Sequence, residues 1–188
     1  MYKTEKTVLM LKTIATIGGL ALLLWTLGLP SLRFADAANN TTVSDTLSDS
    51  APSAASTHTI DFVSPTGVTM GSTLVLTFPT GGSEFDPSSI GQNDIDLLVG
   101  GSNVPAADWS VATTATSITL TLNSTSIAPG ASSTILIGTN ATNEGSPTSD
   151  ILNPSSEGSY EINLAAGTSD SGSMRVVILS SVVVTASV

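Results

Sequence analysis

The stretch Ile118-Thr-Leu-Thr-Leu122 decides the fold, because it alternates apolar and polar residues without a break. Successive side chains of a β-strand point to opposite faces of a sheet, so Ile118, Leu120 and Leu122 share one face. The two threonines between them then face solvent, and threonine is a residue that favours strands. The stretch therefore predicts a half-buried β-strand.

The same alternation recurs at short intervals on both sides of this stretch. Turn-forming residues separate the runs, as in Pro79-Thr-Gly-Gly82 and Ala128-Pro-Gly130. No stretch after residue 38 keeps the 3.6-residue period of a helix. About seven to nine short strands with Gly/Pro turns predict an all-β sandwich or a small barrel. The other apolar strand faces are His58, Ile60 and Phe62; Leu74, Leu76 and Phe78; Ile95, Leu97 and Val99; Trp109 and Val111; Ile135 and Ile137; and Tyr160, Ile162 and Leu164.

The last run, from Met174 to Val188, differs because it is apolar on both faces. Ser180-Ser181 is a candidate bulge within it. As one strand, at ~3.3 Å per residue, the run would reach about 50 Å, which is longer than a sandwich strand needs. We expect part of it to lie centrally in a sheet. We expect its far end, with Val182, Val183 and Val184, to project toward another chain.

Residues 1–37 have the features of a secretory signal peptide. Three lysines precede an apolar run from Thr13 to Leu29. As a helix this run spans roughly 26 Å, short of a ~30 Å hydrocarbon core. Ala35 and Ala37 supply the small residues that signal peptidase reads, so cleavage is expected after Ala37. Two alternatives to a signal peptide are an uncleaved membrane anchor and a type IV prepilin segment processed near Gly18-Gly19.

The sequence thus predicts three parts. Residues 1–37 are the signal peptide, and residues 57–188 are the sandwich domain. Between them, residues 38–56 are polar apart from Val43, Leu47 and a few small alanines. This middle part is either a linker or a first strand that could be donated to a neighbour.

Charge is distributed unevenly along the chain. The sequence has 15 acidic and 5 basic residues, for a net charge of −10, and Arg175 is the one basic residue after residue 38. Nucleic acids and anionic lipids need clustered Lys and Arg, so both are excluded as partners of the mature part. Membrane contact is expected only through the signal segment. The chain has no cysteine, which excludes disulfide scaffolds, thiol chemistry and thiolate zinc sites.

His58 is the only histidine, so a Ser-His-Asp triad would have to use it as the base. It lies in a predicted strand, and no Gly-x-Ser-x-Gly nucleophile turn occurs. The sequence therefore predicts that the protein is not an enzyme.

Four acids form a loose cluster of candidate metal ligands: Glu84, Asp86, Asp94 and Asp96. Asp94 and Asp96 are expected on one face of a strand, where they could hold a calcium ion with loop oxygens. No calcium-loop motif such as Asp-x-Asp-x-Asp-Gly occurs, so a solvated acidic strand face is the favoured explanation. No other cofactor is predicted.

Asn123 and Asn140 begin Asn-x-Ser/Thr sequons in predicted turns. They are candidate glycosylation sites if the host glycosylates, although such sequons arise by chance in a chain this rich in Ser and Thr.

Several longer phrases carry a resemblance to a known group of proteins. Together they resemble uncharacterised secreted surface proteins of small-genome bacteria, the candidate phyla radiation. The resemblance implies an immunoglobulin-like β-sandwich at the cell surface, and it implies no reaction. The phrases are Val43-Ser-Asp-Thr-Leu-Ser-Asp-Ser-Ala-Pro-Ser53, His58-Thr-Ile-Asp-Phe62, Ile137-Gly-Thr-Asn-Ala-Thr142, Ile151-Leu-Asn-Pro154, Gly158-Ser-Tyr-Glu-Ile162 and Asp170-Ser-Gly172.

These observations predict a secreted, non-catalytic structural or adhesion protein of the cell surface. Its expected partners are copies of itself or other surface proteins. In a sharper variant it is a pilin-like filament subunit, in which the strand around Val43 and Leu47, or the tail 182–188, completes a neighbour's sheet. The alternatives are a carbohydrate- or calcium-dependent binding module and, last, a secreted hydrolase.

Overall fold

The computed structural model describes residues 10, 12–19, 22, 39–79, 84–143 and 145–180. The chain divides into two compact units, Met1–Asp36 and Ala37–Val188. In the first unit residues 12–19 are helical. No helix within the described ranges is long and apolar enough to span a bilayer. The predicted cleavage residues Ala35 and Ala37 lie outside the described residues.

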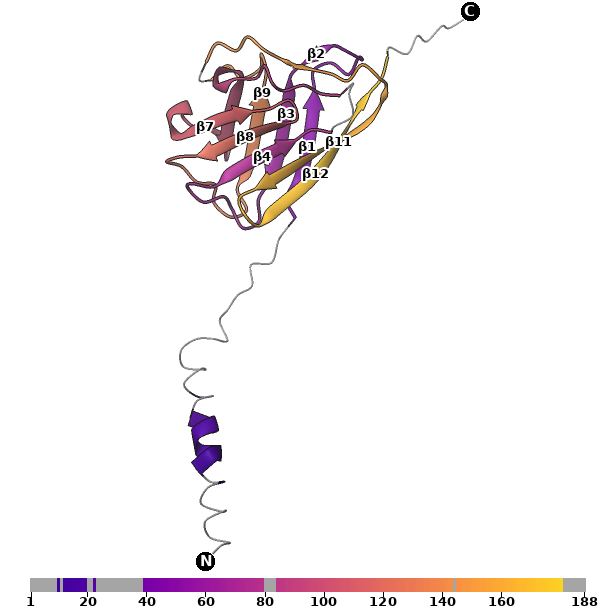
Figure 1. The fold of residues 1–188 in the computed structure, drawn as a ribbon. Helices are drawn as coiled ribbons and strands as arrows, with labels where there is room; N and C mark the ends of the chain where they lie inside the picture. Colours follow the sequence, from indigo (N-terminus) through magenta and orange to yellow (C-terminus); the bar gives the residue numbers. More distant parts are fainter. Residues whose placement is uncertain are drawn as a thin grey trace, which may run out of the picture. The chain divides into compact units, whose positions relative to one another are not determined.

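The second unit is a sandwich of two five-stranded antiparallel sheets (Figure 1). It confirms the predicted all-β, immunoglobulin-like fold, with nine strands of five or more residues among those described. One sheet has the order β1 (Thr41–Leu47), β3 (His58–Val63), β9 (Ser132–Ile137), β5 (Ile95–Val99) and β6 (Ser102–Asn103). The other has the order β12 (Asp170–Ile178), β11 (Gly158–Ala166), β4 (Thr73–Thr77), β8 (Ser117–Leu122) and β7 (Trp109–Thr113). A short pair joins β2 (Ala55–Ser56) to β10 (Ile151–Leu152).

Alternation in the sequence sets the buried faces. In β8 every second residue is buried, and Ile118, Leu120 and Leu122 are fully buried as predicted. The inner faces of the two sheets form one core in which Val, Ile and Leu predominate. Three residues of the predicted faces are only partly buried: Val99, Val111 and Tyr160. Helical structure in the described part of this unit is limited to two short 3-10 turns, η2 (Gln92–Asp94) and η3 (Ala106–Asp108).

The C-terminal run is organised differently from the expectation. β12 begins at Asp170, before the predicted start at Met174, and it is an edge strand. For the described part of the run, residues 174–180, the expectation of a central position in a sheet is therefore wrong. Residues 181–188, which include Val182, Val183 and Val184, lie outside the described residues.

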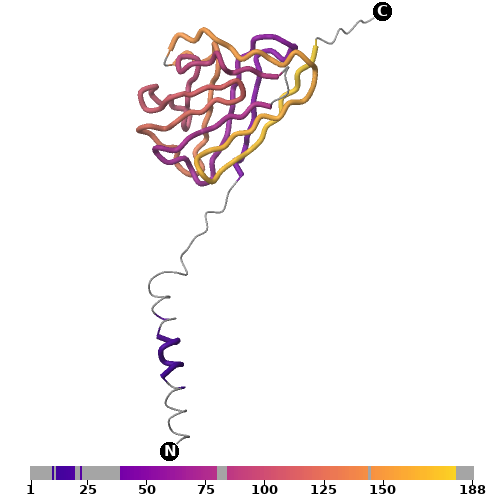
Figure 2. Tube along the Cα trace, viewed as in Figure 1, coloured from indigo at the N-terminus to yellow at the C-terminus, as the bar shows by residue number. Residues whose placement is uncertain are grey.

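The segment 38–56 contributes a strand to the sandwich. β1 pairs with β3 alone and forms the edge of its sheet. β12 pairs with β11 and forms the edge of the opposite sheet, where Ser171 also bridges to Asn39, just before β1. These two edge strands come from opposite ends of the domain sequence, yet they lie side by side (Figure 2). We call the line between β1 and β12 the seam.

Candidate functional site

The inner face of β1 carries an acid between two apolar residues. Val43 and Leu47 point inward and are partly buried against the core. Asp45 occupies the position between them, where period-two alternation places its side chain on the same face. In the β1–β3 ladder Asp45 lies opposite Ile60, and Leu47 lies opposite His58.

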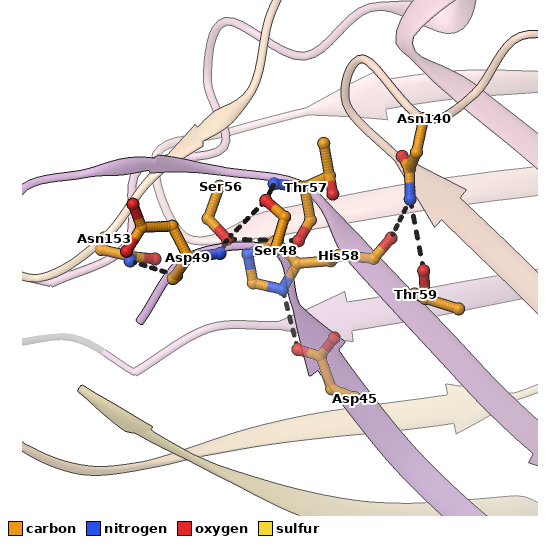
Figure 3. A network of polar contacts seen from close by, with 9 residues as sticks. All are labelled: Asp45, Ser48, Asp49, Ser56, Thr57, His58, Thr59, Asn140 and Asn153. Atoms are coloured by element: carbon orange, nitrogen blue, oxygen red, sulfur yellow. Dashed lines mark hydrogen bonds and ion pairs between the residues drawn. The ribbon is translucent and has the colours of Figure 1, made fainter. Parts of the chain in front are cut away.

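Asp45 and His58 form a buried pair across this ladder (Figure 3). The Asp45 Oδ2 atom lies 2.7 Å from the His58 Nδ1 atom, and both side chains are 0% exposed. The His58 ring packs edge-on against Phe78 and Phe85, with ring centroids 6.0 and 5.6 Å away. A buried carboxylate is costly unless it is paired and hydrogen-bonded, so the pair fixes how β1 lies on β3.

The second polar atom of each partner has no hydrogen-bond partner among the described residues. These atoms are His58 Nε2 and Asp45 Oδ1. In a Ser-His-Asp site Nε2 would accept the proton of the nucleophile. Here no hydroxyl of the described chain reaches it, and the ring is shielded from solvent. Among the described residues, the geometry supplies two members of a triad and no nucleophile within hydrogen-bond reach of Nε2.

Hydrogen bonds close the connection between β1 and β3, residues 48–57 (Figure 3). The Thr57 backbone N–H donates to Ser48 Oγ at 2.9 Å, and the Ser48 N–H donates to the Thr57 carbonyl at 3.1 Å. The Asp49 N–H donates to Ser56 Oγ at 3.2 Å. The Asn153 side chain donates to the Asp49 carbonyl at 2.9 Å and so ties this connection to β10.

Two grooves lie along the seam. The larger, about 510 Å³, extends from the seam over β11 to β4 and is lined by Asn39, Asn40, Val43, Thr77 and residues 163–165 and 171–173. The smaller, about 300 Å³, is lined by residues 45–47 of β1 and residues 175–177 of β12. Beside it Val177 is 49% exposed and Leu179 is 51% exposed. The seam thus combines two edge strands with exposed apolar side chains.

The sequence makes Asp94 a candidate metal ligand, with a solvated acidic strand face as the favoured alternative. In the structure it is 5% exposed at the end of η2. Its Oδ1 atom accepts the backbone N–H groups of Thr148 and Ser149 at 2.7 and 3.0 Å, and its Oδ2 atom accepts that of Gly91 at 2.9 Å. Burial raises the pKa of Asp94, but these hydrogen bonds outweigh it and hold the pKa below its ordinary value. The carboxylate anchors the loop that precedes β10.

The other acids of the predicted cluster do not form a common site. Asp96 is fully buried and accepts the backbone and side-chain N–H groups of Asn143 at 2.8 and 2.9 Å. Asp86 is exposed, and hydrogen bonds from Ser88 lower its pKa. With Glu84 included, no group of three His, Cys, Asp or Glu within the described ranges could hold a metal ion. The interpretation as a solvated acidic strand face is therefore wrong for Asp94 and Asp96, whose carboxylates accept hydrogen bonds inside the domain.

The two sequons differ in accessibility. Asn123 is exposed in a bend directly after β8. Asn140 is partly buried, and its side-chain nitrogen donates to the His58 carbonyl at 3.3 Å and to Thr59 Oγ1 at 3.2 Å. A glycan on this nitrogen would break both hydrogen bonds, so the structure favours Asn123 over Asn140.

Comparison with known proteins gives a likeness to solved structures only. No protein-family model matches the chain, and no curated protein matches it. The bacterial hydrophobin BslA is 9% identical, with a TM-score of 0.44 over 73% of this chain and 98% of that one. BcpA, the major pilin subunit of Bacillus cereus, is 12% identical with a TM-score of 0.40, and the match covers 72% of this chain but 39% of the pilin. A Nocardia farcinica protein with an immunoglobulin-like fold is 17% identical, with a TM-score of 0.35 over 77% of this chain and 88% of that one.

Proposed function

We propose that the protein is a non-catalytic structural protein of the cell surface whose copies associate through the seam. One observation carries this proposal: two edge strands lie side by side, joined by one bridge between Asn39 and Ser171, and Val177 and Leu179 are exposed beside them. An unprotected strand edge presents free N–H and C=O groups to another chain. Exposed apolar side chains next to such an edge add the burial that makes strand addition favourable.

The polar groups of the domain support a structural role. The one histidine packs against Asp45, Phe78 and Phe85, and its side chain is 0% exposed. Asp94 and Asp96 are occupied by hydrogen bonds within the domain. A net charge of −10 and the absence of cysteine suit a protein that is exported and folds by packing alone.

Export is proposed from the sequence of residues 1–37. Mass spectrometry of the protein recovered from outside the producing cell should give a chain that begins at Ala38. A recovered chain that retains Lys3 would instead mean an uncleaved anchor.

Two segments could be the strand supplied to a neighbour. One is β1, and the other is the β-branched tail 182–188. Because supplying a strand in this way is a head-to-tail contact, repetition around a closed rotation gives a ring, and repetition without closure gives a filament.

Light scattering and negative-stain imaging of residues 38–188 test the association. We expect oligomers or filaments that grow with protein concentration. Leu179→Lys adds a charge at the seam and should shift the population toward monomer. Met70→Lys is the matched control, because Met70 is also an exposed apolar residue, at 64%, but lies in a turn before β4. A clean monomer of the unmodified domain at high concentration would overturn the proposal.

A further inference from the structure

We infer that β1 is the strand exchanged between copies, so that β1 of one molecule pairs with β3 of another and inserts Asp45 beside the partner's buried imidazole. This inference rests on the proposed self-association and names the segment that performs it. The occupant of the β3 edge is then β1 of a second copy in place of the molecule's own β1.

The first support is where the backbone is strained. Among the described residues, Thr42 (φ 54°) and Ser53 (φ 57°) are the non-glycine residues with positive φ. Thr42 lies within β1, beside a register shift between Thr41 and Ser44, and Ser53 lies in the connection 48–57. A β-branched residue in the left-handed region is a genuine outlier, and strain in a hinge loop favours exchange of the segment it connects. The strain at Ser53 therefore lies in the hinge that would have to open, whereas the strain at Thr42 belongs to the β1–β3 pairing and is kept in the exchanged form.

The second support is that few apolar contacts hold β1 to the core. Its ladder partner is β3, and on its other side the Asn40 N–H, just before β1, donates to the Ser171 carbonyl of β12 at 2.7 Å. Its two apolar inward residues, Val43 and Leu47, are only partly buried. Departure of β1 thus removes little apolar contact from the core.

The third support is that the β3 edge selects a strand with a carboxylate. A shift of β1 by one residue would turn Asp45 to the outer face and leave His58 buried without its partner. The tail 182–188 has no acidic residue, so it would also leave the imidazole unpaired. β1 supplies the carboxylate of Asp45 to the buried imidazole of His58, whether β1 comes from the same molecule or from a second copy. A polar pair that fixes register in this way gives specificity to strand pairing.

The connection between the strands is long enough for the exchange. Ten residues separate Leu47 from His58, and an extended chain of that length spans at most about 33–36 Å. The hydrogen bonds of Ser48 with Thr57, and of Asp49 with Ser56, hold the connection in its closed form. Leu179, whose backbone N–H donates to the Ser50 carbonyl at 2.9 Å, lies beside this hinge. The seam residue tested above therefore lies where two exchanged molecules would meet.

Engineered cysteines test the exchange directly, because the chain has none of its own. Thr46 and Thr59 lie opposite each other in the β1–β3 ladder, and directly opposite residues are close enough for a disulfide after small adjustments. One version of residues 38–188 carries Thr46→Cys and a second carries Thr59→Cys. The two are mixed at a concentration where the domain is associated, oxidised mildly, and separated without reductant. A size tag on one version identifies the heterodimer.

We expect a disulfide between the two versions, because an exchanged β1 brings Cys from one molecule opposite Cys from the other. The double variant Thr46→Cys/Thr59→Cys, oxidised as a dilute monomer, should close within one chain and so shows that the pair can react. Thr119→Cys on the outer face of β8 replaces Thr59→Cys in the matched control and should give only background cross-linking with Thr46→Cys. Asp45→Asn in the Thr46→Cys chain should reduce the heterodimer several-fold.

Contrary results separate the inference from the proposed function. If the domain associates and the double variant closes, but the mixture gives no heterodimer above the Thr119→Cys control, then β1 is not exchanged. Loss of association on removing residues 182–188 would then identify the tail as the supplied strand. If the domain stays monomeric, the proposed function fails before the cross-linking is needed.

Discussion

Thr66 and Asp170, 104 residues apart in the chain, are joined by two hydrogen bonds. The Thr66 backbone N–H donates to the Asp170 carboxylate at 2.9 Å and its hydroxyl donates at 2.8 Å. The Ser64 hydroxyl donates to the same carboxylate, which is buried. Burial raises the pKa of Asp170, but these hydrogen bonds outweigh it and hold the pKa below its ordinary value. The first residue of β12 is thereby tied to the turn that follows β3 in the opposite sheet.

Asp170→Asn should destabilise the domain by about 1–3 kcal/mol at neutral pH, because the amide cannot accept all three hydrogen bonds as a carboxylate does. The folded-state pKa of Asp170 is lower than in the unfolded chain, so the unfolded chain takes up the proton first as pH falls. The stabilisation is complete well above about pH 4 and is lost as pH falls through the folded-state pKa. Urea unfolding between pH 7 and pH 3 should show a shallower acid decline for the variant.

Asp61→Asn is the matched control for this prediction. Asp61 is exposed and accepts one hydrogen bond, from the Thr134 hydroxyl. Its replacement should leave the unfolding free energy nearly unchanged. If the unfolding free energy falls equally steeply with decreasing pH in wild type and in Asp170→Asn, then Asp170 does not contribute to the loss of stability in acid.

Gly67→Ala should be more destabilising than Gly71→Ala, although both glycines have positive φ, 76° and 83°. A Cβ atom at residue 67 would lie 2.5 Å from the Ile127 carbonyl oxygen and 2.8 Å from the Pro129 nitrogen, whereas residue 71 faces open space. Gly71→Ala should cost about 1–2 kcal/mol for the left-handed conformation alone. Gly67→Ala adds a clash with backbone atoms, so its thermal unfolding should occur several degrees lower. Equal melting temperatures for the two variants would contradict the close approach of the turn at Gly67 to the turn at residues 127–129.

The strand faces could be predicted from the sequence because period-two alternation is a local property. Ile118, Leu120 and Leu122 needed only the pleat of a strand to be assigned to the core. Strand neighbours could not be predicted where they join distant segments, as in the pairing of β3 with β9 and the approach of β1 to β12. β12 shows how far alternation can be used. Its apolar run suggested a central strand, but its outward positions include Arg175 and the half-exposed Val177.

The Asp45–His58 pair left a signal in the sequence that strand alternation could have exposed. Asp45 stands between Val43 and Leu47 at a core-facing position, and His58 stands in phase with Ile60 and Phe62. Two ionisable residues at core positions of successive strands predict each other as partners. The roles of Asp94 and Asp96 left no comparable signal. Their hydrogen-bond donors lie in the loop around residues 143–149, whose return over β5 is a property of the tertiary fold.

Asp94→Asn should loosen the loop that precedes β10. The Oδ1 atom of Asp94 accepts the backbone N–H groups of Thr148 and Ser149, and an amide in its place holds them more weakly. We expect faster hydrogen exchange at these two amides, with little change at the Ile118 amide in β8. The effect should be the same with millimolar calcium and with a chelator, because the carboxylate acts on backbone N–H groups. Slower hydrogen exchange at the Thr148 and Ser149 amides when calcium is added to the wild type would instead support a calcium site at Asp94.

Removal of either member of the buried pair should be strongly destabilising, and removal of both should be much less so. Asp45→Leu leaves an imidazole buried without its acceptor, and His58→Phe leaves a carboxylate buried without its donor. Each single change should cost about 3–5 kcal/mol, measured by urea unfolding at a dilution where the domain is monomeric. The double variant places Leu and Phe beside Phe78 and Phe85, an apolar environment that accepts both, so its cost should fall well below the sum of the single changes. Additive costs would mean that Asp45 and His58 do not depend on each other, and the pair would then give β1 no specificity for its place beside β3.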